Sequence, residues 1–147
     1  MLSKEEMELI NILTEAIFPG AIEAQTYNFV LRDMESNPFL VGVYRNGLQQ
    51  LERAAQQLFR LSLLHLDKNQ LNQLLIQNEN TPFFELLRDH TLEGVFSDPI
   101  YGGNFEGYGW RLLGYAGPTF YPPETINKTR HPTIYYSLGG IVYEEKT

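Results

Sequence analysis

The stretch NPFLVGVYRNGLQQLERAAQQLF, residues 37–59, decides the fold class of this 147-residue chain. Asparagine suits a helix N-cap and proline suits the first helical position, so we expect a helix to begin at Asn37 and Pro38. Apolar residues then follow at steps of three and four: Val41, Tyr44, Leu48, Leu51, Ala55 and Leu58. This spacing predicts a long helix with one face packed against other helices, and Gly47 beside that face permits close contact.

Similar start and stop signals surround this helix. Ser3 with Glu6, and Asp67 with Gln70, have the spacing of capping boxes, and Thr81 precedes a proline. Pro-Gly at positions 19–20 predicts the end of the first helix, a weaker helix is expected over residues 21–35, and Gly94 is expected to end the helix after Pro82. The sequence therefore predicts a mainly α fold, with a bundle of four to five helices over about residues 3–94.

A long loop rich in glycine and aromatic residues is expected over about residues 95–132. Between positions 98 and 123 lie six glycines, four prolines and seven aromatic residues. Glycine and proline exclude a continuous regular helix, and the many rings favour an ordered loop that packs on something.

A β-hairpin is expected over residues 133–145. The run TIYYSL is rich in strand formers, and Gly139-Gly140 suits a two-residue turn before IVY. A hairpin alone is only marginally stable, so it must pack on the bundle or on a partner. We expect one domain over residues 1–147.

Composition limits the classes of function. The formal net charge of −7 argues against nucleic acid binding, which needs basic surface. There is no run of about 18 apolar residues, so no membrane span is expected. The first residues lack the pattern of a secretory signal, which predicts a cytoplasmic location for the chain as written. The absence of cysteine excludes thiol catalysis and cysteine-ligated metal sites.

No catalytic, cofactor-binding or metal-binding constellation is evident. The glycine spacing does not match a phosphate-binding loop, and the serines lack a nucleophile-elbow context. The histidines, His65, His90 and His131, do not share a ligand-type spacing. A metal set of His90, Asp98, Glu106 and His131 is conceivable, but nothing in the spacing demands it.

The aromatic loop is the candidate site for binding a partner, because tyrosine and tryptophan dominate interface hot spots. The predicted partner-binding residues are Asp98, Pro99, Tyr101, Gly102, Gly103, Asn104, Gly109, Trp110, Gly114 and Tyr115. Three other interpretations stay open: the loop seals the end of the bundle, stacks on a sugar, or forms a small-ligand or enzymatic site with the bundle near His90 and Asp98. A homo-oligomer formed through the apolar face of residues 41–58 is a further alternative.

Several motifs together resemble one family. They are FFELLRDHTLEG at residues 83–94, SDPIYGGN at 97–104, Gly109-Trp110 and GYAG at 114–117, with PGAIEA at 19–24 and Tyr44-x-x-Gly47-Leu48. In this combination the chain resembles subunit 3 of gluconate 2-dehydrogenase, the small subunit of flavoprotein sugar and polyol dehydrogenases. The resemblance covers roughly residues 5–118.

The resemblance implies a non-catalytic accessory subunit. In the family, a large subunit of the glucose–methanol–choline type binds FAD and oxidises the sugar, and a multihaem cytochrome c subunit often takes the electrons. The small subunit helps the large one to mature, hold its flavin and reach the periplasm by a twin-arginine signal. No twin-arginine pattern stands at the start of the sequence as given, so we expect the chain to stay in the cytoplasm, or to be periplasmic or membrane-associated if it is exported with a partner. The resemblance implies no cofactor in this chain.

Overall fold

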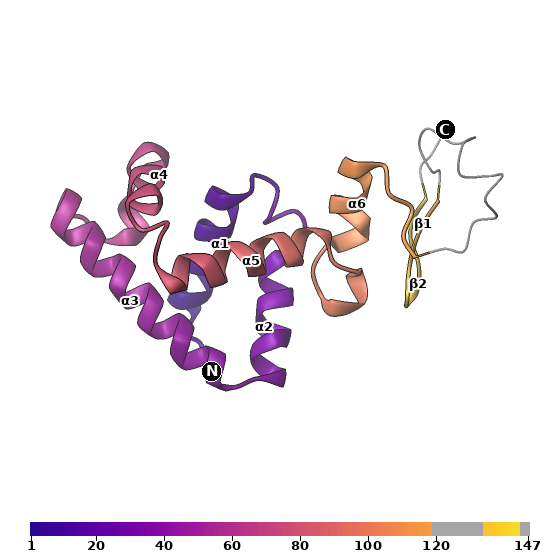
Figure 1. The fold of residues 1–147 in the computed structure, drawn as a ribbon, viewed down its shortest axis with the longest axis horizontal. Coiled ribbons are helices and arrows are strands. Elements are labelled where there is room, and N and C mark those ends of the chain that lie inside the picture. The colour runs from indigo at the N-terminus through magenta and orange to yellow at the C-terminus, as the bar shows by residue number, and fades with distance from the viewer. Residues whose placement is uncertain (119–133, 145–147) are drawn as a thin grey trace.

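The computed structural model describes residues 1–118 and 134–144. Six α-helices, three single 3-10 turns and two strands make up this part of the chain (Figure 1). In chain order they are α1 (Lys4–Ile17), α2 (Thr26–Ser36), α3 (Phe39–Phe59), η1 (Leu63–His65), α4 (Lys68–Gln77), α5 (Pro82–Phe96), η2 (Pro99–Tyr101), η3 (Phe105–Gly107), α6 (Tyr108–Leu113), β1 (Ile134–Ser137) and β2 (Gly140–Glu144). The fold is mainly α with a C-terminal hairpin, as the sequence predicts.

The predicted helix starts at Ser3, Asp67 and Thr81 are confirmed by side-chain hydrogen bonds, whereas α3 begins at Phe39 with Pro38 as its N-cap and without the side-chain cap predicted for Asn37. The Ser3 hydroxyl accepts from the Glu6 backbone N–H at 3.1 Å, and the Glu6 carboxylate accepts from the Ser3 N–H at 2.7 Å. Asp67 and Gln70 form the same reciprocal pair at the start of α4. These capping boxes satisfy N–H groups that the first helical turn leaves without a partner.

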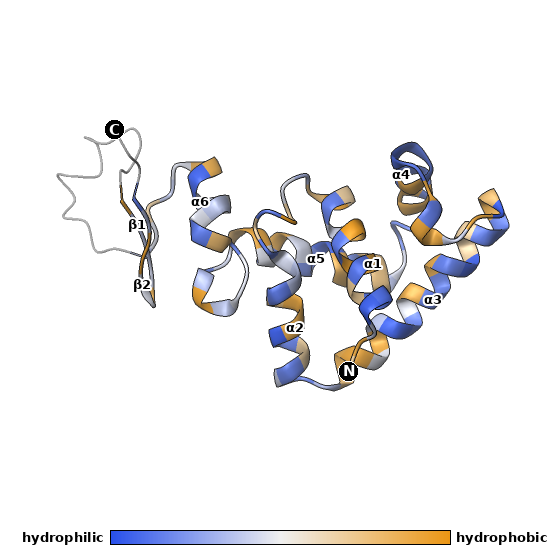
Figure 2. Cartoon of the chain, turned by 180° about the vertical axis from the view of Figure 1, so that it is seen from behind, coloured by the Kyte–Doolittle hydropathy of each residue, from blue (hydrophilic) through white to orange (hydrophobic). Residues whose placement is uncertain are grey.

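Helix α5 lies at the centre of the molecule, with the other helices packed around it at steep crossings (Figure 1). Along α3, apolar and polar residues alternate as expected for a helix with one buried face (Figure 2). Four members of the predicted face are buried, namely Tyr44, Leu48, Leu51 and Ala55, whereas Leu58 is exposed. Gly47 faces the Phe83 ring so closely that no β-carbon would fit. The face is thus used inside the chain, which argues against its use between two copies.

Two helix boundaries differ from the prediction. Helix α2 begins at Thr26 instead of position 21, because the preceding residues form turns and Gln25 adopts a left-handed conformation with φ 52°. Helix α5 continues through Gly94 to Phe96, so the prediction of a stop at Gly94 is wrong. A β-carbon at Gly94 would lie 2.6 Å from Cγ2 of Thr26, so this glycine serves the packing of α2 against α5.

The segment after α5 contains more regular structure than the sequence indicates. It holds the turns η2 and η3 and the short helix α6, whose ends are set by Gly107 and Gly114 in left-handed conformations. The hairpin is confirmed, but its turn is Leu138-Gly139 instead of Gly139-Gly140. Gly140 begins β2 with a positive φ of 116°, and the Ser137 hydroxyl accepts from the Gly139 N–H. The predicted ends of this hairpin, at positions 133 and 145, lie outside the described residues.

Within residues 1–118 and 134–144, no helix is both long enough and apolar enough to cross a membrane.

Candidate partner-binding site

Asn104 holds the segment after α5 against the end of that helix. Its backbone N–H donates to the carbonyl of Gly94 at 2.6 Å, and its side-chain amide donates to the carbonyl of Ser97 at 2.8 Å. The amide oxygen accepts from the Gly109 N–H at 2.7 Å. Asn104 is fully buried and left-handed, a conformation that asparagine tolerates better than most residues. One side chain therefore satisfies backbone groups on both sides of the loop.

Trp110 lies on the inner face of α6. Its exposed fraction is 4%, and its indole N–H donates to the carbonyl of Phe96 at 2.8 Å. Gly109 and Gly103 pass so close to the carbonyls of Val95 and Gly94 that neither could carry a β-carbon without movement. We call the contacts of residues 103–110 with residues 94–97 the α5–α6 junction. It supplies donors to carbonyls that the end of α5 leaves without helical partners.

The connection between α1 and α2 completes this junction. The Phe105 N–H donates to the carbonyl of Ala24 at 3.0 Å, and Ala21, Ala24 and Val95 form a small buried cluster beside the main core. Gly20, at φ 107°, leaves room for the hydroxyl end of Tyr108. These contacts explain the small residues at positions 20, 21 and 24.

Asp98 connects the segment to the hairpin. One carboxylate oxygen accepts from the Ile100 N–H at 2.9 Å and the other from the Leu138 N–H at 2.8 Å. The hairpin is also bonded through the Tyr136 N–H, which donates to the carbonyl of Ala116 at 2.7 Å. On its other side, the Arg111 guanidinium lies 4.1 Å from the centre of the Tyr143 ring. Thus the hairpin packs on the segment, as its small size requires.

The predicted partner-binding residues fall into three groups. Gly103, Asn104, Gly109 and Trp110 are buried and bind within the chain. Tyr101 and Tyr115 are exposed, by 55% and 46% respectively. The four others are half-buried: Asp98, Pro99, Gly102 and Gly114. The segment therefore does seal one end of the bundle, and it also presents part of its surface outward.

Sequence reasoning missed the apolar residues that are most exposed on this segment. Leu112 and Leu113, at the end of α6, are exposed by 58% and 65%. Ile100 and Phe105 are exposed by 44% and 45%. The sequence does contain a signal for these exposed leucines: they stand directly before Gly114, and Trp110 precedes them by two residues. Trp110 occupies the inner face of the short helix and leaves the leucines outside.

His90 belongs to a buried hydrogen-bonded chain instead of a metal site. Its Nδ1 lies 2.7 Å from the Tyr44 hydroxyl and its Nε2 lies 3.1 Å from a carboxylate oxygen of Asp33. Asp98 is bonded elsewhere, so the structure does not bring it together with His90. Among the described residues there is no group of three or more acidic or histidine side chains that could hold a metal ion. His131, a member of the conceivable set, lies outside them.

A groove of about 270 Å³ between α2 and η2 is lined by Phe29, Arg32, Asp33, Ser36, Ile100 and Tyr101. Arg32 donates to the carbonyl of Ile100 at 2.6 Å across this groove, which fastens η2 to α2.

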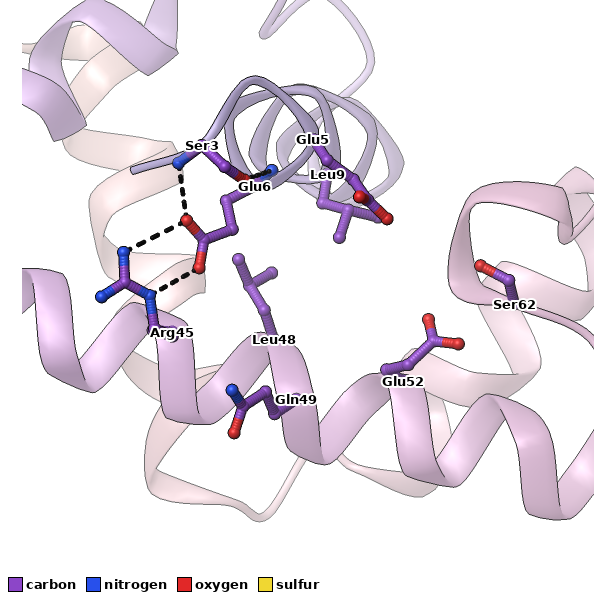
Figure 3. A pocket seen from close by; sticks show the side chains of 9 residues that line it. All are labelled: Ser3, Glu5, Glu6, Leu9, Arg45, Leu48, Gln49, Glu52 and Ser62. Atoms are coloured by element: carbon purple, nitrogen blue, oxygen red, sulfur yellow. Dashed lines mark hydrogen bonds and ion pairs between the residues drawn. The ribbon is translucent and has the colours of Figure 1, made fainter. Parts of the chain in front are cut away.

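The second groove, of about 550 Å³, lies between the start of α1 and α3 (Figure 3). Its lining is mixed, and two of its charged residues, Glu6 and Arg45, pair with each other. Arg45 contacts the Glu6 carboxylate at 2.8 Å, and the hydrogen bond from Arg45 holds the pKa of Glu6 below its ordinary value. The Glu52 carboxylate accepts from the Leu63 N–H at 2.8 Å. These interactions fasten α3 to α1 and to η1.

Comparison with protein families gives a direct result. The family model described as gluconate 2-dehydrogenase subunit 3 matches residues 4–117. The chain belongs to the gluconate 2-dehydrogenase subunit 3 family. No significant match was found among curated proteins or solved structures.

The match to gluconate 2-dehydrogenase subunit 3 includes the α5–α6 junction. It covers α1 to α6 and stops at Gly117, before the hairpin. Three of the motifs that carry the resemblance have a common place in the structure: residues 19–24, 97–104 and 109–110 meet at this junction. In this subunit 3 chain they build the platform from which α6 and the exposed tyrosines project.

Proposed function

We propose that this chain is a non-catalytic accessory subunit that binds and helps to assemble an FAD-dependent flavoprotein large subunit of the glucose–methanol–choline type. The observation that carries the proposal is the family match over residues 4–117, since the family is named as a subunit of a dehydrogenase. Substrate oxidation and FAD binding then belong to the large subunit.

The chemistry of the candidate site supports this role. Two polar side chains of the glycine-rich segment bind backbone groups of the chain: both oxygens of Asp98 and both amide atoms of Asn104 have such partners. Beside the exposed Glu106, the segment presents aromatic and aliphatic side chains outward, including Tyr101 and Tyr115. A surface of this kind suits contact with another protein better than binding of a polar substrate.

The further components follow from the family resemblance. We propose that a cytochrome c subunit accepts the electrons from the flavoprotein in the complete complex. We also propose that the complex works in the periplasm or at the membrane after export with a partner. The sugar or polyol that is oxidised is set by the large subunit.

The proposal is tested by expressing the flavoprotein encoded nearest to this chain, with and without the chain. Flavin content per purified flavoprotein and dehydrogenase activity are measured in both preparations. We expect both quantities to fall strongly without the chain, and the two proteins to co-elute when made together. Equal flavin loading and activity in both preparations, with no co-elution, would rule out an assembly subunit.

The groove between α2 and η2 favours a second candidate, a small-ligand or enzymatic domain. It lies between the glycine-rich segment and the helical bundle. Its lining combines two charged residues, Arg32 and Asp33, with the rings of Phe29 and Tyr101. A ligand with an anionic group and hydroxyls would fit this lining. Replacing Arg32 by Gln should then abolish ligand binding while leaving co-elution with the flavoprotein unchanged. The accessory role predicts no ligand for this groove.

A further inference from the structure

Three apolar side chains at and just after the end of helix α6 are exposed. Leu112, Leu113 and Tyr115 are exposed by 58%, 65% and 46%, and we call them the α6 tip. The helix ends directly behind the two leucines, because Gly114 adopts a left-handed conformation with φ 65°. In both overall views this end of α6 lies at the boundary of the molecule (Figures 1 and 2). The α6 tip is therefore a small apolar projection.

The backbone that carries the α6 tip, and the Tyr115 ring, are held from inside. Trp110, on the opposite face of the same helix, is buried and bonded to the carbonyl of Phe96. The Tyr115 ring stands edge-on against the Trp110 ring, with centroids 5.3 Å apart, and the Tyr115 N–H donates to the Trp110 carbonyl at 2.9 Å. A side chain that is already fixed loses little conformational entropy on binding, which is a property of interface anchors.

We propose that the α6 tip inserts into an apolar recess of the flavoprotein large subunit and is the main anchor of the complex. This inference rests on the proposed function and deepens it by naming the surface that binds. Under this inference Leu112 and Leu113 contact the partner. Trp110, which the sequence predicted as a partner-binding residue, instead lies inside the chain.

Two observations favour a different protein over a second copy of this chain as the occupant. Three projecting side chains bury little area when they meet the same three side chains of a second copy, far less than the roughly 800 Å² per partner of a stable interface. A recess in a different protein would instead contact the group on all sides. The net charge of −7 also opposes the approach of two identical chains. Neither the small buried area nor the repulsion between identical chains applies to a larger partner with a recess.

The test uses serine substitutions that remove apolar surface without adding charge. Leu113→Ser and the double variant Leu112→Ser/Leu113→Ser are compared with Ile76→Ser. Ile76 is a matched control, because it is also an aliphatic residue near the end of a helix and is exposed by the same 65%. The apparent Kd of each purified full chain for the flavoprotein is measured, together with its thermal unfolding and its mass by light scattering.

We expect the double variant to raise Kd at least about tenfold, as for the loss of an interface hot spot, while Ile76→Ser binds as the unmodified chain does. All variants should unfold near the same temperature; if the double variant does not fold, Leu113→Ser alone decides. Unchanged binding by a folded tip variant would overturn the anchor and leave the proposed function standing. An unmodified chain that does not bind the flavoprotein would overturn both. Loss of a homodimer with unchanged Kd would assign the α6 tip to a second copy and overturn the inference.

Discussion

The hydroxyl oxygen of Tyr44 lies 2.7 Å from Nδ1 of His90, in the interior where α3 packs on α5. Burial raises the pKa of Tyr44, and the negative charges of Asp33 and Glu93 raise it further, so the phenol stays neutral. We infer that it donates its proton to Nδ1, which assigns the other ring proton to Nε2, facing Asp33 at 3.1 Å. Helices α2, α3 and α5 thus share one polar chain.

Replacing Tyr44 by Phe should destabilise the protein by about 1–2 kcal/mol, because it leaves Nδ1 of His90 buried without a partner. Urea unfolding followed by circular dichroism measures this difference. Tyr101→Phe is the control: that side chain is more than half exposed, and its substitution should change stability by less than about 0.5 kcal/mol. Equal stability of both variants would show that the Tyr44–His90 bond contributes nothing net.

The Glu6–Arg45 pair predicts a pH dependence of stability. The pKa of Glu6 is lowered in the folded protein, first by its hydrogen bond from Arg45, so the carboxylate stabilises the fold above its ordinary pKa. That contribution is lost as the pH falls through the lowered value, because Glu6 is then protonated in both states. We expect Glu6→Gln to cost less than about 1 kcal/mol at pH 7, since the pair is partly exposed. The cost should vanish in strong acid.

Unfolding of Glu6→Gln is compared with that of Glu5→Gln across this pH range. Glu5 is exposed and lies in the same helical turn, so its substitution controls for the loss of one negative charge. A cost for Glu6→Gln that persists unchanged below the lowered pKa would contradict the ionic origin of the effect.

Gly109→Ala should be strongly destabilising, by about 2 kcal/mol or more, because its β-carbon would collide with the carbonyl of Val95. Gly42→Ala is the matched control on a helix. A β-carbon at position 42 meets nothing within 4 Å, so alanine should stabilise the protein by about 0.5–1 kcal/mol. Thermal unfolding distinguishes the lower stability expected for Gly109→Ala from the higher stability expected for Gly42→Ala. A tolerated alanine at position 109 would mean that α6 does not pack as closely on α5 as described.

Asn104→Ala should loosen the α5–α6 junction, because it removes two side-chain hydrogen bonds and leaves the Ser97 carbonyl and the Gly109 N–H without partners. Trp110 is the single tryptophan of the chain, so its fluorescence reports on this region alone. We expect a red shift of its emission and faster quenching by acrylamide, with little loss of helical circular dichroism. Emission identical to that of the unmodified chain would show that Trp110 stays in place without Asn104.

The local signals of the sequence predict the helices well. Capping boxes at Ser3 and Asp67, and the threonine before Pro82, depend on neighbours within four residues, and all three are confirmed. Gly94 shows where this reasoning fails. Locally it is a typical helix stop, but its role is set by Thr26 of α2, some seventy positions away in the sequence.

The candidate site shows the same limit. Composition correctly indicates that residues 98–115 form an ordered segment, yet it does not distinguish a tryptophan that anchors the segment from one that faces a partner. That distinction depends on whether a free carbonyl, here that of Phe96, lies opposite the indole N–H. The pair of leucines before Gly114 indicates an exposed apolar site only once the burial of Trp110 on the inner face of α6 is known.

The α5–α6 junction also bears on how the chain reaches this structure. Asn104, Gly109 and Trp110 contact partners only 5 to 14 positions away along the chain. Closing such short loops costs little entropy and is fast. The bond from Leu138 to Asp98, by contrast, closes a loop of 40 positions. Formation of α6 on α5 can therefore precede attachment of the hairpin, so that the outward-facing surface of this segment is in place before the last element of the fold joins it.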